Sequence, residues 1–209
     1  AGPTDLEALG SLPRLAVSDR DLMDCEQFGY GTYSPLTGFM DRATLESVLG
    51  THRLPSGDVW TLPMLLQVDR EAVSGWGVGD RVALTDSQGV VHALLDVSEV
   101  YHYDLGDLAQ RMYGTTSPDH PGVGNLMAQG DAFVGGDVTL VRALESPLRH
   151  YLLTPAQTRF IFTRLGWSRV VAFHTRNVAH RGHEWIQHQA LELTGADGRP
   201  PRVIRSLHL

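Results

Sequence analysis

Residues 170–192 contain a change of periodicity that limits how this part of the chain can fold. The run 170–173, Val-Val-Ala-Phe, is short, apolar and rich in β-branched residues, which is typical of a buried parallel strand. A polar loop, 174–182, follows it. From His183 onward the apolar residues recur at helical spacing, and Gly195 ends the run as a glycine after a helix does. The sequence therefore predicts a strand, a polar loop and a helix.

The loop between this strand and this helix carries side chains that can bind an anion. Open α/β sheets bind ligands beyond the carboxyl ends of their strands, where the unpaired N–H groups and the dipole of a helix N-terminus favour negative charge. The donors in the loop are Thr175, Arg176, Asn177 and Arg181. His180 and His183 are three residues apart, so they fall on one face of a helical turn. The pattern indicates a site for phosphate or sulfate.

Three other interpretations of these residues are weaker. His180, His183 and His188 could bind zinc, but the spacing is one residue too long for the H-E-x-x-H pattern of a helix face. A P-loop is excluded because the chain contains no lysine. The isolated histidines are better interpreted as surface or satisfied core residues, namely His52, His92, His102 and His150.

Composition narrows the class of protein. A chain of 209 residues forms one or two domains and can bury a sizeable core. The formal net charge of -7 argues against nucleic acid as a partner, because phosphate neutralisation needs a basic surface. Cys25 is the single cysteine, so nothing requires an oxidising compartment. No apolar run reaches membrane-spanning length and no signal pattern opens the chain, so we expect a cytoplasmic protein without a membrane partner.

The first 150 residues are predicted to be rich in short strands. Predicted strands are 60–68, 81–85, 90–97, 97–103 and 137–144, and predicted helices are 19–28, 41–49 with Asp41 as its cap, and 104–113. Residues 86–89 have the pattern of a hairpin turn, and 114–123 that of a proline-glycine loop. Many short antiparallel strands and few helices favour a small barrel. A further helix opens at Thr154-Pro155, with Phe160, Ile161 and Leu165 as its apolar stripe, so we expect a domain boundary near His150.

Four segments stand out in the chain: TYSPLTGFM at 32–40, YGTTSPDHPGV at 113–123, YLLTP at 151–155 and FHTRNVAHRGHE at 173–184. Together they resemble the sulfate adenylyltransferase family, also called ATP sulfurylase. The resemblance implies an α+β chain, with an N-terminal PUA-like β-barrel domain at 1–150 and, at 151–209, the start of an α/β, Rossmann-like nucleotidyltransferase domain. It also implies the reaction of sulfate assimilation, in which ATP and sulfate give adenylyl sulfate and pyrophosphate. Mg²⁺ would accompany the nucleotide, with no tightly bound cofactor.

The resemblance assigns roles to the loop residues. The catalytic residues would be Thr175, Arg176 and Asn177, and the substrate-binding residues would be His174, Arg176, Asn177, His180 and His183, with no metal ligand among them. Arg176 would hold sulfate, and the two histidines of the loop would contact ATP phosphates. Sulfate is itself the nucleophile of an in-line displacement, so the side chains need only position the reactants and stabilise developing charge.

Two departures from the family qualify these expectations. His174 stands where many members carry a glutamine that helps to bind sulfate, although an imidazole can still donate. No second phosphate-contacting loop of Gly-Arg-Asp-His type follows Gly198, and residues 199–209 do not resemble the family. One strand and two helices cannot enclose ATP, so we expect this chain by itself to be an incomplete, inactive fragment. The full-length form is expected to be a homo-oligomer.

Two alternatives stay open at the level of sequence. One is a non-catalytic PUA-like binding or interaction module that keeps a remnant of the oxyanion site. The other is a nucleotidyltransferase whose acceptor is a different oxyanion, which the presence of His174 leaves possible. The net acidity of the chain argues against RNA as the ligand of such a module.

Overall fold

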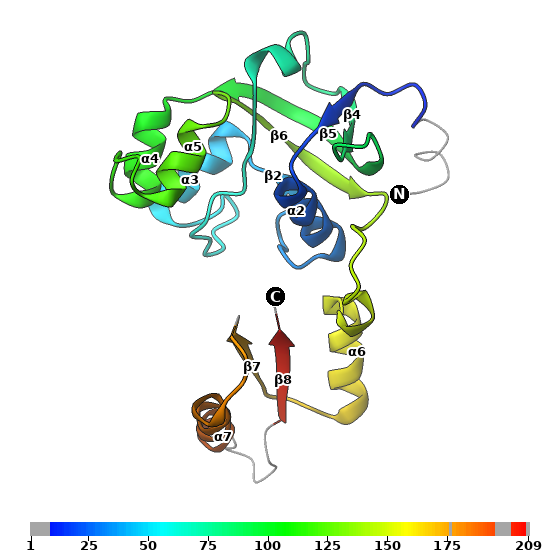
Figure 1. The fold of residues 1–209 in the computed structure, drawn as a ribbon, viewed down its shortest axis with the longest axis vertical. Helices are drawn as coiled ribbons and strands as arrows, with labels where there is room; N and C mark the ends of the chain where they lie inside the picture. Colours follow the sequence, from blue (N-terminus) through cyan, green and yellow to red (C-terminus); the bar gives the residue numbers. More distant parts are fainter. Residues whose placement is uncertain (1–8, 176, 195–201, 208–209) are drawn as a thin grey trace. The chain divides into compact units, whose positions relative to one another are not determined.

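A computed structural model describes residues 9–175, 177–194 and 202–207 (Figure 1). The chain divides into two compact units, Ala1–Thr154 and Pro155–Leu209, called unit 1 and unit 2 below. Each unit has its own sheet, with six strands in unit 1 and two in unit 2. A search of the described residues finds no helix that is both long enough and apolar enough to cross a membrane.

The sheet of unit 1 is mixed. Its strands are β1 (Arg14–Ala16), β2 (Gly38–Phe39), β3 (Leu66–Val68), β4 (Arg81–Thr85), β5 (Val91–His102) and β6 (Ala132–Leu140). They follow the order β1-β4-β5-β6-β2, and β3 also pairs with β6. β1 runs parallel to β4, whereas the other pairs are antiparallel. β6 therefore organises the sheet, because it pairs with β5, β3 and β2.

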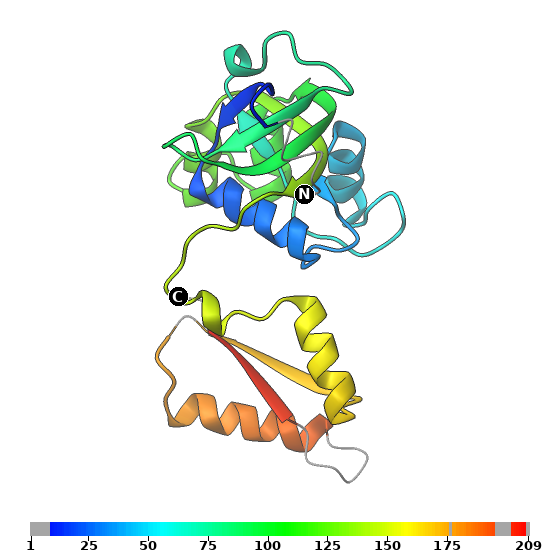
Figure 2. The ribbon, with the colours of Figure 1, turned by 90° about the vertical axis from the view of Figure 1, so that its right-hand side faces the viewer.

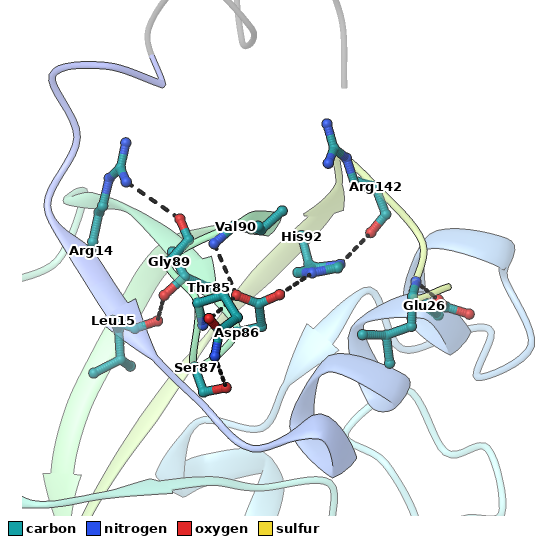
Figure 3. Close-up of polar contacts among 12 residues, drawn as sticks. Arg14, Leu15, Glu26, Thr85, Asp86, Ser87, Gly89, Val90, His92 and Arg142 are labelled. Carbon is teal, nitrogen blue, oxygen red and sulfur yellow. Dashed lines mark hydrogen bonds and ion pairs between the residues drawn. The ribbon is translucent and has the colours of Figure 1, made fainter. Parts of the chain in front are cut away.

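The hairpin of β4 and β5 confirms the turn predicted at 86–89. The Asp86 carboxylate accepts hydrogen bonds from the N–H groups of Gln88 and Val90, both at 2.9 Å, and Gly89 has a positive φ of 78° (Figure 3). The Val90 N–H is the main cause that lowers the pKa of Asp86, and His92 adds to it. The two strands predicted at 90–97 and 97–103 are one strand, β5, interrupted by a register shift between Val97 and Glu99.

Glycines allow the short strand β2 to lie against β6. A Cβ on Gly38 would come within 1.9 Å of the carbonyl oxygen of Gly136, and one on Gly136 within 2.2 Å of that of Asp96. Only hydrogen fits at these positions, so the backbones of β2, β6 and β5 can approach closely. This contact gives a structural reason for Gly38 in the segment at 32–40.

Four α-helices accompany this sheet: α2 (Asp19–Tyr30), α3 (Arg42–Thr51), α4 (Leu105–Tyr113) and α5 (Pro121–Met127). Ser18, Asp41 and Asp104 cap the first three through their side chains. Two 3₁₀ turns, η1 (Arg70–Val73) and η2 (Arg149–Tyr151), complete the unit. The predicted strand 60–68 is confirmed only at Leu66–Val68, and the predicted 137–144 begins earlier, at Ala132. α5 lies partly in the predicted loop 114–123, because Pro121 occupies a first-turn position.

Unit 1 has a core with two apolar clusters. The larger lies between α2 and the sheet, and its fully buried members include Leu22, Cys25, Leu66, Leu84 and Leu95. The smaller joins α3, α4 and α5 to β5 and β6 through Leu45, Tyr101, Leu108, Val123 and Phe133. Burial raises the pKa of the Cys25 thiol, which is consistent with its place in the larger cluster.

His92 ties the end of the sheet to the segment that leaves it. The N–H groups of Val141 and Arg142 both donate to the carbonyl oxygen of His92 at 2.9 Å. The His92 ring is buried, with Nδ1 3.1 Å from the carbonyl oxygen of Arg142 and Nε2 3.2 Å from a carboxylate oxygen of Asp86 (Figure 3). The β4–β5 turn and the chain beyond β6 are thus joined through one imidazole.

A second contact holds the same segment to α2. The buried carboxylate of Glu26 accepts from the N–H of Leu144, and from the Arg149 guanidinium at 3.1 Å. Arg149 also donates to the hydroxyl of Tyr30 at 2.9 Å. Residues 144–149 therefore belong to unit 1.

Unit 2 comprises α6 (Pro155–Leu165), β7 (Val170–Thr175), α7 (Arg181–Thr194) and β8 (Arg202–Leu207). β7 and β8 are parallel, with Val171 opposite Val203 and Ala172 opposite Ile204. Both views place these strands between α6 and α7 (Figures 1 and 2). Residues 202–207, which belong to the stretch 199–209 expected to lie outside the family, form β8 beside β7.

The expectation of a buried strand at 170–173 is wrong. β7 is a parallel strand, but its residues alternate between exposed and half-buried. α6 likewise buries none of its residues, and Phe160 of its predicted apolar stripe is 66% exposed. Burial of a parallel strand requires neighbours on both edges and layers on both faces, and the described part of unit 2 has only two strands.

Candidate oxyanion site

The candidate site lies where β7 ends and α7 begins. β7 ends at Thr175 and α7 begins at Arg181, and residues 177–180 are the described part of the loop that connects them. The predicted order of strand, polar loop and helix is confirmed, although the helix begins two residues before the predicted His183. His180 immediately precedes α7, and its carbonyl oxygen accepts from the N–H of Glu184 at 3.1 Å. His180 therefore occupies the N-cap position.

The first part of the loop folds around the side chain of Thr175. The Asn177 N–H donates to the Thr175 hydroxyl oxygen at 3.0 Å, and that hydroxyl lies 3.4 Å from the Asn177 carbonyl oxygen. This local turn places both residues at the carboxyl end of β7. His174 precedes them on β7 and is exposed, as is Asn177. Arg176, the residue predicted to hold sulfate, lies outside the described residues.

The structure brings His180 and His183 together. Their ring centroids are 3.9 Å apart with 30° between the planes, so the imidazoles stack. The His180 N–H donates to Nδ1 of His183 at 3.3 Å, and the Gly182 N–H donates to Nδ1 of His180 at 3.1 Å. The Phe173 ring lies beside His183, with centroids 5.5 Å apart. The prediction that the two histidines share one face of a turn is confirmed.

This arrangement is chemically suited to an anion. Among the described residues, the N–H groups of Arg181 and His183 in the first turn of α7 have no acceptor, and such groups carry the positive end of the helix dipole. Nε2 of each imidazole likewise has no partner within the described part of the chain. His180 is exposed and His183 half-buried, so a ligand can reach both.

A metal site finds no support in the described residues. They contain no group of three or more His, Cys, Asp or Glu side chains placed to hold a metal ion. His188, the third residue of the zinc alternative, is exposed on α7. Glu184 is the only carboxylate in residues 174–184, so this segment offers mostly N–H and hydroxyl donors.

Comparison with known proteins gives the family. The PUA-like domain model matches residues 4–143, and the ATP-sulfurylase model matches residues 149–205, which include the loop and most of β8. A sulfate adenylyltransferase of Symbiobacterium thermophilum is 46% identical over 195 residues, covering 92% of this chain and 50% of that protein. The chain belongs to the PUA-like domain family at residues 4–143, and it is similar to sulfate adenylyltransferases over most of its length. The ATP-sulfurylase match reaches into 199–209, the stretch expected to lie outside the family.

Other sulfate adenylyltransferases show the same coverage. One from Synechococcus sp. (strain JA-3-3Ab) is 41% identical over 182 residues, covering 87% of this chain and 46% of that protein. The chain thus spans about half the length of the curated relatives it matches. A solved structure described as a hexameric APS kinase from Thiobacillus denitrificans superposes with a TM-score of 0.72 at 26% identity, covering 97% of this chain and 35% of that one.

Two features of the site were not predicted from the sequence. Gly182 is one, because a Cβ there would lie 3.0 Å from Cε1 and 3.2 Å from Nδ1 of the His180 ring. Phe173 is the other, as the aromatic neighbour of His183. The His-x-Gly-His spacing in the sequence is the signal that could have indicated the first.

Proposed function

We propose that the segment 174–183, from the end of β7 to the first turn of α7, is one wall of the site at which sulfate adenylyltransferase joins sulfate to the adenylyl group of ATP. The observation that carries this proposal is the stacked pair His180 and His183 at the N-terminus of α7, within the segment that matches ATP-sulfurylase. A helix N-terminus with two imidazoles offers N–H donors to an oxyanion. The non-catalytic alternative is not favoured, because relatives matching 87–92% of the chain are named sulfate adenylyltransferase.

The proposed reaction needs no nucleophile from the protein. An oxygen of sulfate attacks the α-phosphorus of ATP and forms the new bond of adenylyl sulfate. The bond from the α-phosphorus to the oxygen that bridges to the β-phosphorus breaks, and that oxygen leaves with the electron pair in pyrophosphate. Catalysis then rests on holding the reactants in line and on donors aimed at the developing charge.

The roles of the loop residues follow from what each can donate. Arg176 offers a planar guanidinium that matches two sulfate oxygens, and His174 adds an imidazole at the end of β7. Thr175 and Asn177 are held together by their local turn, so they would line the junction of sulfate and α-phosphate. His180 and His183 would contact the ATP phosphates and stabilise charge in the transition state.

Mg²⁺ fits this proposal as part of the MgATP substrate. Apart from Glu184, the described residues of 174–184 bear no carboxylate, and Mg²⁺ prefers oxygen ligands. The ion would therefore be bound by phosphate oxygens and water, where it would neutralise phosphate charge. The loop would supply hydrogen-bond donors that complement this charge rather than metal ligands.

The extent of the chain shapes what it can do alone. We assign residues 1–150 to the PUA-like domain and 151–209 to the beginning of a Rossmann-like nucleotidyltransferase domain. Because the chain spans about half of its relatives, we expect the 209-residue form to bind oxyanions weakly and not to turn over. A cytoplasmic homo-oligomer is proposed for the full-length form, and the likeness to a structure described as hexameric supports assembly.

The activity is tested by measuring pyrophosphate release from ATP with sulfate. We expect turnover from a form extended to the length of the relatives and none from the 209-residue chain. Turnover by the short chain would show that its residues complete the site. Absence of turnover from the extended form, with that form folded, would contradict the proposed reaction.

Sulfate titration of the short chain tests the loop itself. Arg176→Ala should weaken binding roughly ten- to hundredfold, because a charged hydrogen bond contributes about 1.5–3 kcal/mol. Arg176→Lys should weaken it less, since the charge remains while the fork is lost. Arg164→Ala on α6 is the matched control, because it removes one arginine charge outside the loop. If Arg164→Ala and Arg176→Ala weaken sulfate binding equally, the binding depends on the overall charge of the chain and not on a site in the loop.

The domain assignment is tested by limited proteolysis. If residues 1–150 form a self-sufficient domain, the first cuts should fall beyond them and leave that fragment intact. First cuts within residues 60–141 would contradict the assignment.

A further inference from the structure

The start of α7 contains a two-way exchange of hydrogen bonds between backbone and imidazoles. The Gly182 N–H donates to Nδ1 of His180, and the His180 N–H donates to Nδ1 of His183. In a capping box, the N-cap side chain accepts from the N–H of the residue three positions later, and the side chain of that residue accepts from the N-cap N–H. His180 differs only in accepting from the residue two positions later, Gly182. Here imidazole nitrogens take the place of the usual hydroxyl and carboxylate oxygens.

The bonds decide where each neutral ring carries its proton. An imidazole nitrogen that accepts an N–H bond cannot itself be protonated, so the proton of each neutral ring must be on Nε2. We propose that the backbone of the first turn of α7 holds His180 and His183 as Nε2–H tautomers, which makes their Nδ1 atoms positioning groups and their Nε2–H groups a fixed pair of donors. This inference rests on the proposed function only for the identity of the acceptor, an oxyanion of the substrate.

The stacking of the rings supports this assignment. At 3.9 Å between centroids, two imidazoles pack favourably when neutral and repel when both are charged. Arg181, the next residue along the chain, adds a further positive charge near His180, whereas Glu184 adds a negative charge on the same turn. A proton on Nδ1 of either ring would also turn its acceptor into a donor facing another N–H. The arrangement is therefore self-consistent for two neutral rings.

Gly182 is part of the same device. Gly182 is not one of the described glycines with a positive φ, so a need for unusual backbone conformation does not explain a glycine here. The space does, because a Cβ would lie 3.0 Å from Cε1 and 3.2 Å from Nδ1 of His180. Adding a methyl group would move the ring by a few tenths of an ångström and lengthen the bond from the Gly182 N–H. Gly182→Ala should therefore loosen His180 while leaving His183 in place.

The tautomers can be observed directly in the ¹⁵N-labelled 209-residue chain. A long-range ¹H–¹⁵N correlation spectrum at about pH 8, where an ordinary imidazole is neutral, separates protonated from unprotonated ring nitrogens. We expect an unprotonated Nδ1 and a protonated Nε2 for both rings, assigned by the loss of signals in His180→Gln and His183→Gln. A proton on Nδ1 of either ring would overturn the inference. Neither sulfate nor turnover is needed for this result.

Two replacements of His183 separate the positioning atom from the donor. His183→Asn keeps an acceptor, its amide oxygen, near the position of Nδ1 but has no donor at Nε2. His183→Gln can place an amide N–H near Nε2 but has no acceptor at Nδ1. Asn should preserve the protection of the His180 amide from hydrogen exchange and weaken sulfate binding roughly tenfold. Gln should reduce that protection. Unchanged protection in His183→Gln would contradict the proposed role of Nδ1 of His183 as the acceptor of the His180 N–H.

The two proposals can fail separately. If the tautomers and the exchange data are as expected but wild-type sulfate binding is absent, the proposed function fails and the assignment of the tautomers stands. If sulfate binds and His183→Asn binds it as tightly as the wild type, the Nε2–H donor of His183 is not used and this inference fails. Gly182→Ala should have an intermediate effect. It should reduce the protection of the residue 182 amide from hydrogen exchange, but by less than His180→Gln does.

Discussion

The two units of this chain differ sharply in how they bury side chains. In unit 1 each β-strand and α-helix contributes at least one buried apolar residue to the core. Among residues 155–175 and 177–193 of unit 2, whose burial is described, the only buried side chain is that of Gln187, and α6 buries none. Large apolar side chains of unit 2 stay in solvent, with Phe160 66% and Trp185 64% exposed. The regular elements α6, β7 and α7 therefore lie without a closed core among the residues whose burial is described.

The difference shows which features of a site depend on a core. A two-stranded sheet with one helix on each side is too small to enclose apolar surface, whereas six strands with four helices can do so. The hydrogen bonds of the candidate site nevertheless join residues within 175–184, all of them close in sequence. The first turn of α7 can therefore be arranged locally, without a core around it.

The largest effect should come from a core truncation in unit 1. Phe133 is fully buried and stacks on Tyr101 with centroids 5.5 Å apart. Phe133→Ala should lower the free energy of unfolding by about 3–5 kcal/mol, measured by urea unfolding. Phe160→Ala in unit 2 is the control and should change it by less than about 0.5 kcal/mol, because that ring is exposed. If both substitutions lowered the free energy of unfolding equally, the difference in burial between the two units would not be a difference in stability.

An extended form of the protein should change the behaviour of unit 2. If the remaining length of the relatives covers α6 and α7, Phe160→Ala and Trp185→Ala should each cost about 1.5–3 kcal/mol in the extended form. The same substitutions should stay near neutral in the 209-residue chain. Small effects in both forms would show that these rings face solvent in the longer protein too.

A smaller, pH-dependent effect is expected at Asp86 in unit 1. Its lowered pKa, caused first by the Val90 N–H and then by His92, means that its contribution to stability is present above the unfolded value of about 3.9 and is lost as the pH falls through the folded pKa. Asp86→Asn should therefore destabilise unit 1 at pH 7, and less than Phe133→Ala does. The difference from wild type should close below about pH 4. A difference that is independent of pH would assign the effect to packing.

Imidazole geometry offers a spectroscopic form of the same comparison. Nδ1 of His92 faces the carbonyl oxygen of Arg142, whereas Nδ1 of His180 and of His183 both face N–H donors. A carbonyl oxygen only accepts, so the bond to Arg142 requires a proton on Nδ1 of His92. We expect the ¹⁵N spectrum to show a protonated Nδ1 for His92 and an unprotonated Nδ1 for each of His180 and His183 in unit 2. Identical patterns at all three rings would remove the contrast.

Local rules were sufficient to predict several elements. Asp41 caps α3, the turn at 86–89 joins β4 to β5, and Arg181–Thr194 is a helix. Caps, turns and helical periodicity depend only on residues that are close in sequence, so a local pattern predicts them. α5 could also have been predicted, since Pro121 stands in its first turn. For the site, the sequence supplied the loop, its donors and the proximity of His180 to His183.

Features that depend on distant partners could not be predicted in this way. β2 lies in a segment dense in turn residues and becomes a strand only because Gly38 pairs with Asp137, far along the chain. The apolar run at 170–173 has the pattern of a buried strand, yet burial depends on neighbours that the described part of unit 2 lacks. The bonds at His180 required side-chain geometry, because periodicity does not say which ring nitrogen meets an N–H.

The smallest effect tests whether the two units are independent, using the capping device that both share. Ser18 accepts from the Asp21 N–H at 3.2 Å while the Asp21 carboxylate accepts from the Ser18 N–H at 3.1 Å. In unit 2 His183 likewise accepts from the N-cap N–H of His180, whereas His180 accepts from Gly182. Ser18→Ala should lower the urea midpoint of unit 1 by the equivalent of about 1 kcal/mol, and exposed Ser74→Ala should leave it unchanged. His183→Gln should loosen exchange at the His180 amide without moving that midpoint. Should His183→Gln shift the midpoint as far as Ser18→Ala does, the two units unfold as one, and the contrast in burial would not be a contrast in stability.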